Sequence, residues 1–161
     1  VDMLLDGGAC EVGIESTIVD LSRGRAVLLR PGHITPAQIA AVLDAEVASP
    51  DAAAPRAPGA LESPYAPRTP LQVVPAAELA ARLAALRGQR LAVLARAEAP
   101  SGLKDINWQE APRAVAGYAR ELYASLRRLD DLGCDLILVE APPAVPGWEG
   151  VNDRLMRASS L

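Results

Sequence analysis

Hydrophobic and polar positions follow two different patterns along the chain. From residue 71 onward, short apolar runs alternate with segments whose apolar residues recur every three or four positions. Short apolar runs are typical of buried strands, and the wider spacing is typical of amphipathic helices. The pattern predicts strands at 71–74, 90–95 and 135–141, helices at 75–87, 112–132 and 150–159, and a polar loop at 96–111. This alternation predicts a small parallel sheet covered by helices.

The first 45 residues contain few predicted elements. We expect strands at about 12–19 and 25–30, followed by a helix that starts at Thr35, with Pro36 at its first position and Gln38 completing a capping box. Below roughly 40 residues a domain rarely builds its own core. The chain also opens without an initiator Met. We therefore expect this part to belong to a larger sheet and the chain to be a C-terminal piece of a longer protein.

The segment "GIESTIVD" places a hydroxyl among apolar residues. In a strand, Ile14, Ser16 and Ile18 would share one face, so that Ser16 interrupts the more apolar side. A strand Ser or Thr often bonds to neighbouring backbone, and it can also face a ligand. The residues alone leave both readings open.

Residues 49–70 contain six prolines and no periodic apolar pattern. Such a segment is extended and semi-rigid, and a spacer between domains is its simplest interpretation. The aromatic Tyr65 argues against a pure spacer, because only 3% of the residues are aromatic. Long loops without secondary structure are often functional.

Composition excludes several classes of protein. The net charge of −4 and the pI of about 5.0 argue against a broad basic surface for nucleic acid. Two cysteines, Cys10 and Cys134, make neither a disulfide framework nor a structural zinc site. No apolar run approaches the roughly 20 residues that span a bilayer, and the sequence has neither GxGxxG nor GxxxxGK[ST]. We expect a soluble cytoplasmic protein that contacts no membrane.

Several motifs together resemble one family. "LDGGACEVGIESTIVDL", "LLRPGHIT" and "APRAPGALESPYAP", followed by "ELYASLRRLDDLGCDLILVEAPP" and "GVNDRLMRAS", are similar to the two-domain YrdC-like threonylcarbamoyl-AMP synthases. The resemblance implies an α/β fold in three parts. Residues 1–47 would end a YrdC-like catalytic domain, 48–70 would form a Pro-rich linker that acts as a lid, and 71–161 would form a small Rossmann-like parallel α/β domain.

The resemblance also implies a reaction. Such enzymes are nucleotidyltransferases that convert ATP, L-threonine and bicarbonate into threonylcarbamoyl-AMP and pyrophosphate, with Mg²⁺ accompanying ATP. The product passes to the machinery that forms threonylcarbamoyladenosine in tRNA. The family's amino-terminal motifs for phosphate, threonine and bicarbonate are missing from this sequence. We therefore expect this part alone to be inactive.

Four residues match positions that bind substrates in the family. Ser16 and Thr17 would contact L-threonine and the adenylate, whereas Arg30 and Tyr65 would contact ATP phosphates. A guanidinium at Arg30 suits two-pronged binding of phosphate oxygens, although an ordinary exposed arginine is the alternative. No catalytic residue and no metal ligand is assigned.

The sequence departs from the family pattern at three positions. Pro64 stands where members commonly have His before Tyr-Ala-Pro, and Ala60 stands where they have Met. His33 occupies a position where small residues are usual, and we expect it on the surface near a helix start. Pro64 removes a donor and stiffens the chain, which puts closure over the site in doubt.

Two other functions stay open at this point. The α/β domain could be a non-catalytic module that senses a nucleotide or docks a partner in tRNA modification. The protein could also contact RNA directly, although its acidic balance and scarce aromatic residues count against strong nucleic-acid binding.

Overall fold

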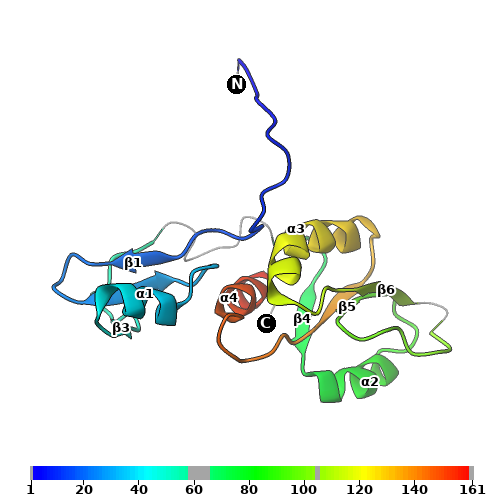
Figure 1. The fold of residues 1–161 in the computed structure, drawn as a ribbon. Coiled ribbons are helices and arrows are strands. Elements are labelled where there is room, and N and C mark those ends of the chain that lie inside the picture. Colours follow the sequence, from blue (N-terminus) through cyan, green and yellow to red (C-terminus); the bar gives the residue numbers. More distant parts are fainter. Residues whose placement is uncertain (1, 58–65, 104–105, 160–161) are drawn as a thin grey trace.

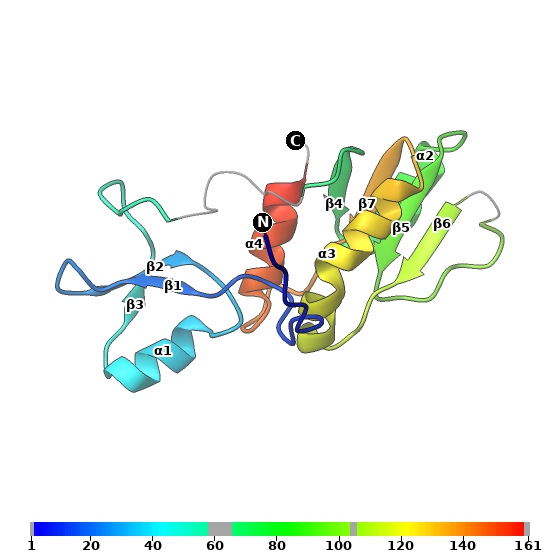
Figure 2. The same ribbon diagram turned by 90° about the horizontal axis from the view of Figure 1, so that it is seen from above.

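The chain forms two sheets, one from each half of the sequence (Figure 1). The computed structural model describes residues 2–57, 66–103 and 106–159. Helix α4 (Glu149–Ala158) lies between the two sheets in both views (Figures 1 and 2). The last helix of the second half is therefore placed to contact the first half.

The first sheet has three short strands. They are β1 (Ile18–Asp20), β2 (Ala26–Arg30) and β3 (Val47–Ala48). Strand β1 is antiparallel to β2, and β2 is parallel to β3. Helix α1 (Pro36–Leu43) connects β2 to β3 and starts with the predicted capping box, in which Thr35 and Gln38 bond to each other's backbone N–H.

The predicted strand at 12–19 is wrong over most of its length. The strand begins only at Ile18, and its pairing with β2 is irregular between Ile18 and Val19. Residues 13–15 pack instead against the second half of the chain, where Gly13 lies on the backbone of α3 (Val115–Asp131). Ser16 therefore lies outside the strand, and the argument from alternating faces does not apply to it.

The second sheet confirms the predicted parallel α/β architecture. Its strands are β4 (Leu71–Val74), β5 (Leu91–Ala95), β6 (Ile106–Glu110) and β7 (Leu136–Glu140). They are all parallel, in the order β4-β7-β5-β6. Helix α2 (Ala76–Ala85) covers one face, and α3 and α4 cover the other.

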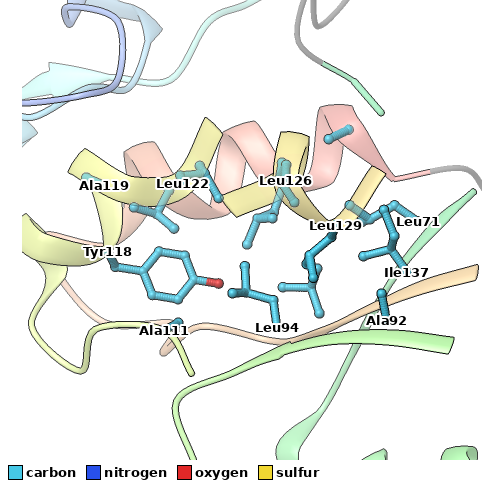
Figure 3. Packing of buried hydrophobic residues seen from close by; sticks show 14 of the residues in the cluster. Leu71, Ala92, Leu94, Ala111, Tyr118, Ala119, Leu122, Leu126, Leu129 and Ile137 are labelled. Carbon is cyan, nitrogen blue, oxygen red and sulfur yellow. The ribbon is translucent and has the colours of Figure 1, made fainter. Parts of the chain in front are cut away.

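Both faces of this sheet are buried, which explains the continuous apolar runs. On β5, Leu91 and Val93 join the cluster under α2, whereas Ala92 and Leu94 join the cluster under α3 and α4. Figure 3 shows the ring of Tyr118 inside this second cluster. The apolar and aromatic residues at helical spacing on α3 are therefore core residues.

One strand and one helix boundary in this half differ from the prediction. The polar loop predicted at 96–111 contains β6, whose polar sequence pairs only with β5 at the sheet edge. In β6 only Ile106 and Trp108 pack against the core, and both are partly buried, so this strand lacks the continuous apolar run by which the other strands were found. The long helix begins at Val115 and not at Pro112, because Ala114 is still extended at its N-cap and Pro112 lies beside Gly117.

Candidate functional site

Arg30 and Ser16 lie together where β2 ends. Arg30 is the last residue of β2, and its Nε donates to the carbonyl oxygen of Ser16 at 3.0 Å. A terminal guanidinium nitrogen lies 3.4 Å from the Ser16 hydroxyl. Ser16 is exposed and Arg30 is partly exposed. A guanidinium beside an exposed hydroxyl can donate hydrogen bonds to the oxygens of a phosphate or a carboxylate.

Thr17 contacts the loop that follows β2. Its hydroxyl donates to the carbonyl oxygen of Ile34 at 2.7 Å. This bond joins Thr17 to backbone 17 positions further along the chain, so it is a tertiary contact and not the local backbone bond of a strand Thr. The Thr17 oxygen keeps its capacity to accept a hydrogen bond from a ligand. The structure thus places Ser16, Thr17 and Arg30 side by side, as residues of one small region.

A glycine makes this close approach possible. Gly32 is buried, and a Cβ there would lie 2.7 Å from the carbonyl oxygen of Glu15. It would also overlap the backbone of Ser16 and Thr17. No real Cβ packs this tightly, so the segment before β1 and the loop after β2 touch only because residue 32 has no side chain.

Tyr65, Pro64 and Ala60 lie outside the described residues, so their predicted roles stay predictions. The described ends of the Pro-rich segment are attached to the two halves of the chain. Asp51 pairs with Arg23 at 2.8 Å and also with Arg25. At the other end, the carboxylate of Asp130 on α3 accepts hydrogen bonds from the backbone N–H groups of Arg68 and Thr69.

A second polar group adjoins Ser16 and was not found from the sequence. The carboxylate of Glu15 accepts a 2.5 Å bond from Arg154 on α4 and bonds of 2.9 and 3.0 Å from the Tyr123 hydroxyl on α3. Arg154 is buried, at 3% exposure. The residue that precedes Ser16 is therefore held by two helices of the second half of the chain.

The pKa of Glu15 reflects these contacts. Partial burial favours the neutral acid, but the hydrogen bonds from Arg154 and Tyr123 and the charge of Arg154 outweigh it, so the pKa of Glu15 is lowered. Burial, and then the hydrogen bond to Glu15, raises the pKa of the Tyr123 phenol. Glu15 is therefore ionised and Tyr123 neutral at pH 7, which is the charge state that this network needs.

One signal in the sequence could have pointed to Arg154. On a helix, positions three and four residues apart share a face. Arg154 stands at that spacing from Val151 and Ala158, both of which are buried. A charged residue within an apolar helical stripe is unusual unless it has a partner. The pattern marks Arg154 as paired, but it does not say with which residue.

Three further features were sought: the position of His33, a group of side chains for a metal ion, and a helix that could span a membrane. His33 is exposed, as predicted. Within residues 2–57, 66–103 and 106–159, no group of three or more His, Cys, Asp or Glu side chains could hold a metal ion. Over the same residues, no helix is both long and apolar enough to cross a membrane.

Comparison with known proteins identifies the family. The family model described as "Threonylcarbamoyl-AMP synthase, C-terminal domain" matches residues 34–160, which is most of the chain. The chain belongs to the threonylcarbamoyl-AMP synthase family. The resemblance noted from the sequence motifs is thus confirmed.

Two curated relatives in this family are both named threonylcarbamoyl-AMP synthase. The protein of Bacillus subtilis is 31% identical over 169 residues, which cover 97% of this chain and 48% of the relative. The protein of Pyrococcus abyssi is 30% identical over 175 residues, which cover 99% of this chain and 49% of the relative. The chain therefore spans about half the length of the curated relatives it matches.

Two solved structures of the synthase family share the fold. A crystal structure of P. abyssi Sua5 complexed with L-threonine superimposes with a TM-score of 0.78 at 28% identity, covering 96% of this chain and 48% of that chain. A variant of P. abyssi Sua5 with a His and a Tyr replaced by Ala gives a TM-score of 0.72 at 27% identity, covering 96% and 47%. The α/β fold with its four-stranded parallel sheet is therefore that of the synthase family.

Proposed function

We propose that this chain forms the end of the catalytic domain, the linker and the C-terminal domain of an L-threonylcarbamoyladenylate synthase. The domains would cover residues 1–47, 48–70 and 71–161. The single observation that carries the proposal is the contact between Arg30 and Ser16, because it places a cation and an exposed hydroxyl at one strand end in a chain of this family. The L-threonine bound to the similar P. abyssi protein supports a small-molecule substrate.

The proposed reaction needs little covalent help from the protein. The amine of L-threonine attacks the carbon of bicarbonate and water leaves, which gives a carbamate. A carbamate oxygen then attacks the α-phosphorus of ATP, the bond to the β-phosphate bridging oxygen breaks, and pyrophosphate leaves. Such a reaction is accelerated mainly by positioning the reactants and by neutralising phosphate charge.

The described residues suit the binding of ATP and L-threonine in this reaction. Arg30 would hold phosphate oxygens of ATP, and Ser16 and Thr17 would bind L-threonine and the adenylate through their hydroxyls. Tyr65 would close on the phosphates, a role that rests on the linker motif alone. The described residues offer no carboxylate cluster for Mg²⁺, so we assign no step to it. This chain by itself would not complete the reaction.

The proposal places the whole protein in tRNA modification in the cytoplasm. Threonylcarbamoyl-AMP is a mixed anhydride, so it must pass quickly to an enzyme that transfers the threonylcarbamoyl group to tRNA. The acidic balance of this chain suits such a hand-over better than strong binding of tRNA by the synthase itself.

Replacing Arg30 in the full-length enzyme tests the proposal. Arg30→Ala should lower kcat/KM for ATP by an amount equivalent to about 2–4 kcal/mol, the scale of a lost charge-assisted contact. Arg30→Lys should restore only part, because a point charge does not reproduce the planar fork. Arg87→Ala, in the exposed turn after α2, removes the same charge from the other half of the chain and serves as the control. Equal kinetics in all three variants and the parent would contradict the assignment.

The Arg30 variants also distinguish the proposed synthase from a non-catalytic module that senses a nucleotide or docks a partner. A nucleotide-sensing or docking module would bind nucleotide through the C-terminal domain, which is remote from Arg30 in the sequence. Nucleotide binding by the full-length protein would then be unchanged in Arg30→Ala. Calorimetric titration of parent and variant with ATP distinguishes the two functions.

A further inference from the structure

A buried guanidinium on helix α4 holds both chain segments that carry the proposed substrate-binding residues. One terminal nitrogen of Arg154 donates to the carbonyl oxygen of Glu15 at 3.2 Å, and the other donates to the carbonyl oxygen of Pro31 at 3.0 Å. Glu15 directly precedes Ser16, and Pro31 directly follows Arg30. One side chain of the C-terminal domain thus spans the two segments whose spacing determines how Ser16 and Arg30 meet.

The side chain of Arg154 is firmly oriented. Its Nε donates to the Glu15 carboxylate at 2.5 Å, and one terminal nitrogen also donates to the Asp153 carboxylate at 2.6 Å. Tyr123 holds the Glu15 carboxylate from the other helix. A buried cation with two anionic partners has no favourable alternative position, because any movement would leave a charge unpaired in a poorly solvated place.

Backbone packing supports the same arrangement. Gly150, in the first turn of α4, lies so close that a Cβ there would be 2.8 Å from the end of the Ile14 side chain and 3.1 Å from the carbonyl oxygen of Gly32. Ile14 in turn packs against the core under α3 and α4. Helix α4 therefore contacts the segment before Ser16 and the loop after Arg30 through backbone as well as through Arg154.

We propose that Arg154 is a positioning residue, through which the C-terminal domain sets the geometry of the Ser16–Arg30 pair for ATP and L-threonine. This inference rests on the proposed function of Ser16 and Arg30. Arg154 itself touches neither substrate in this scheme. It acts by holding two backbone carbonyls, so a change in its side chain alters the spacing of the binding groups, and small misplacements of such groups have large effects on rate.

The shape of the arginine side chain makes the inference testable. A lysine at this position carries the same charge and can pair with the Glu15 carboxylate, but one ammonium group does not reproduce the planar, spread donors of a guanidinium. Arg154→Lys should therefore keep the ion pair between the domains and lose the hold on one or both carbonyls. Arg154→Gln should lose both.

The experiment uses the full-length enzyme with Arg154→Lys, Arg154→Gln and the control Arg157→Gln. Arg157 lies on the same helix and shares Asp153 with Arg154, so its loss removes one charge from this network but no donor to Glu15 or Pro31. We expect kcat/KM for ATP and for L-threonine to fall about tenfold or more in Arg154→Gln and by less in Arg154→Lys. Arg157→Gln should match the parent.

A second readout distinguishes positioning from mere stability. In Arg154→Lys, amide hydrogen exchange should rise at residues 13–17 and 32–34 while the exchange of β5 and β7 stays at the parent level. Combining Arg154→Lys with Arg30→Ala should add little to the loss caused by Arg30→Ala alone, because both changes disable the same binding group. A purely structural role would give independent, additive losses.

Two results would overturn different statements. If Arg30→Ala impairs the enzyme while both Arg154 variants match Arg157→Gln, the positioning role is wrong and the proposed function stands. If Arg30→Ala is silent, the proposed function of the Ser16–Arg30 pair fails first. Should Arg154→Gln not fold, Arg154→Lys decides by itself, since either parent-like kinetics or a loss that adds fully to that of Arg30→Ala overturns the inference.

Discussion

Asp130 accepts two hydrogen bonds of 2.8 Å from Thr69, one from its backbone N–H and one from its hydroxyl. The backbone N–H of Arg68 donates to the same carboxylate at 3.2 Å. Asp130 lies near the end of α3, and Thr69 lies just before β4. The described end of the Pro-rich segment is thus fixed to a helix of the C-terminal domain by one carboxylate.

Removing this carboxylate should destabilise the C-terminal domain. Asp130→Ala leaves the N–H and hydroxyl of the nearly buried Thr69 without their partner, which costs about 1.5–3 kcal/mol. The neighbouring Asp131→Ala is the matched control, because Asp131 is exposed on the same helix. Urea denaturation of the two variants and the parent measures the difference. Equal midpoints for the two variants would contradict the role of Asp130.

The same carboxylate should make stability depend on pH in acid. Burial favours the neutral acid, yet the hydrogen bonds from Thr69 and Arg68 outweigh it and lower the pKa of Asp130 from 3.8 to about 2. A lowered pKa stabilises the folded state above pH 3.8, and this contribution disappears as the pH falls through about 2. The difference in unfolding free energy between the parent and Asp130→Ala should therefore shrink from pH 5 toward pH 2. A constant difference across that range would show that ionisation of Asp130 is irrelevant.

Gly32→Ala tests the close packing beside Ser16. An added Cβ meets backbone atoms, which do not rotate away, so we expect a loss of about 1–3 kcal/mol, as for other overpacked positions. It should also weaken L-threonine binding, because the displaced backbone carries Ser16 and Thr17. Gly7→Ala is the control, since a Cβ there meets nothing within 4 Å. Thermal unfolding and calorimetry with L-threonine measure both effects, and a Gly32→Ala variant that behaves like Gly7→Ala would refute them.

The linker residue Tyr65 can be tested through its two chemical parts. If Tyr65 contacts the nucleotide, Tyr65→Ala should lower the rate of intermediate formation and let more of the labile adenylate hydrolyse. Tyr65→Phe should do so less, and the gap between the two measures the contribution of the hydroxyl. Pro64→His restores the residue common in the family and reports whether Pro64 alters this contact. If both Tyr65 variants form and retain the adenylate like the parent, the segment is only a spacer.

The second half of the protein was largely predictable from local sequence. Strands β4, β5 and β7 and helices α2, α3 and α4 all lie where apolar runs and helical stripes place them. Burial on both faces requires a continuous apolar run, and burial on one side of a helix requires a stripe, so these elements carry their environment in their own sequence. The capping box at Thr35 is equally local, because both of its partners lie within one turn.

Strand β6 and the segment before β1 were not predictable in this way. The polar β6 gains its place by pairing with one neighbour at a sheet edge, which requires no apolar run. The segment before β1 contains good strand formers, yet residues 13–15 pack on α3 and α4, and only Ile18–Asp20 pair with β2. In both cases the competing tertiary contact outweighs the local preference.

The sequence motifs indicated the family, and the resemblance predicted a substrate-binding role for Ser16, Thr17 and Arg30, which stays a prediction. That Arg30 bonds to Ser16, and that Arg154 holds the residues on either side of that pair, depends on the tertiary structure alone. Arg154 and Glu15 are 139 positions apart in the chain. Periodicity in a sequence relates residues of one helix or strand, so it does not predict a hydrogen bond between residues of two distant elements. Only the folding of α4 between the two sheets brings them within reach.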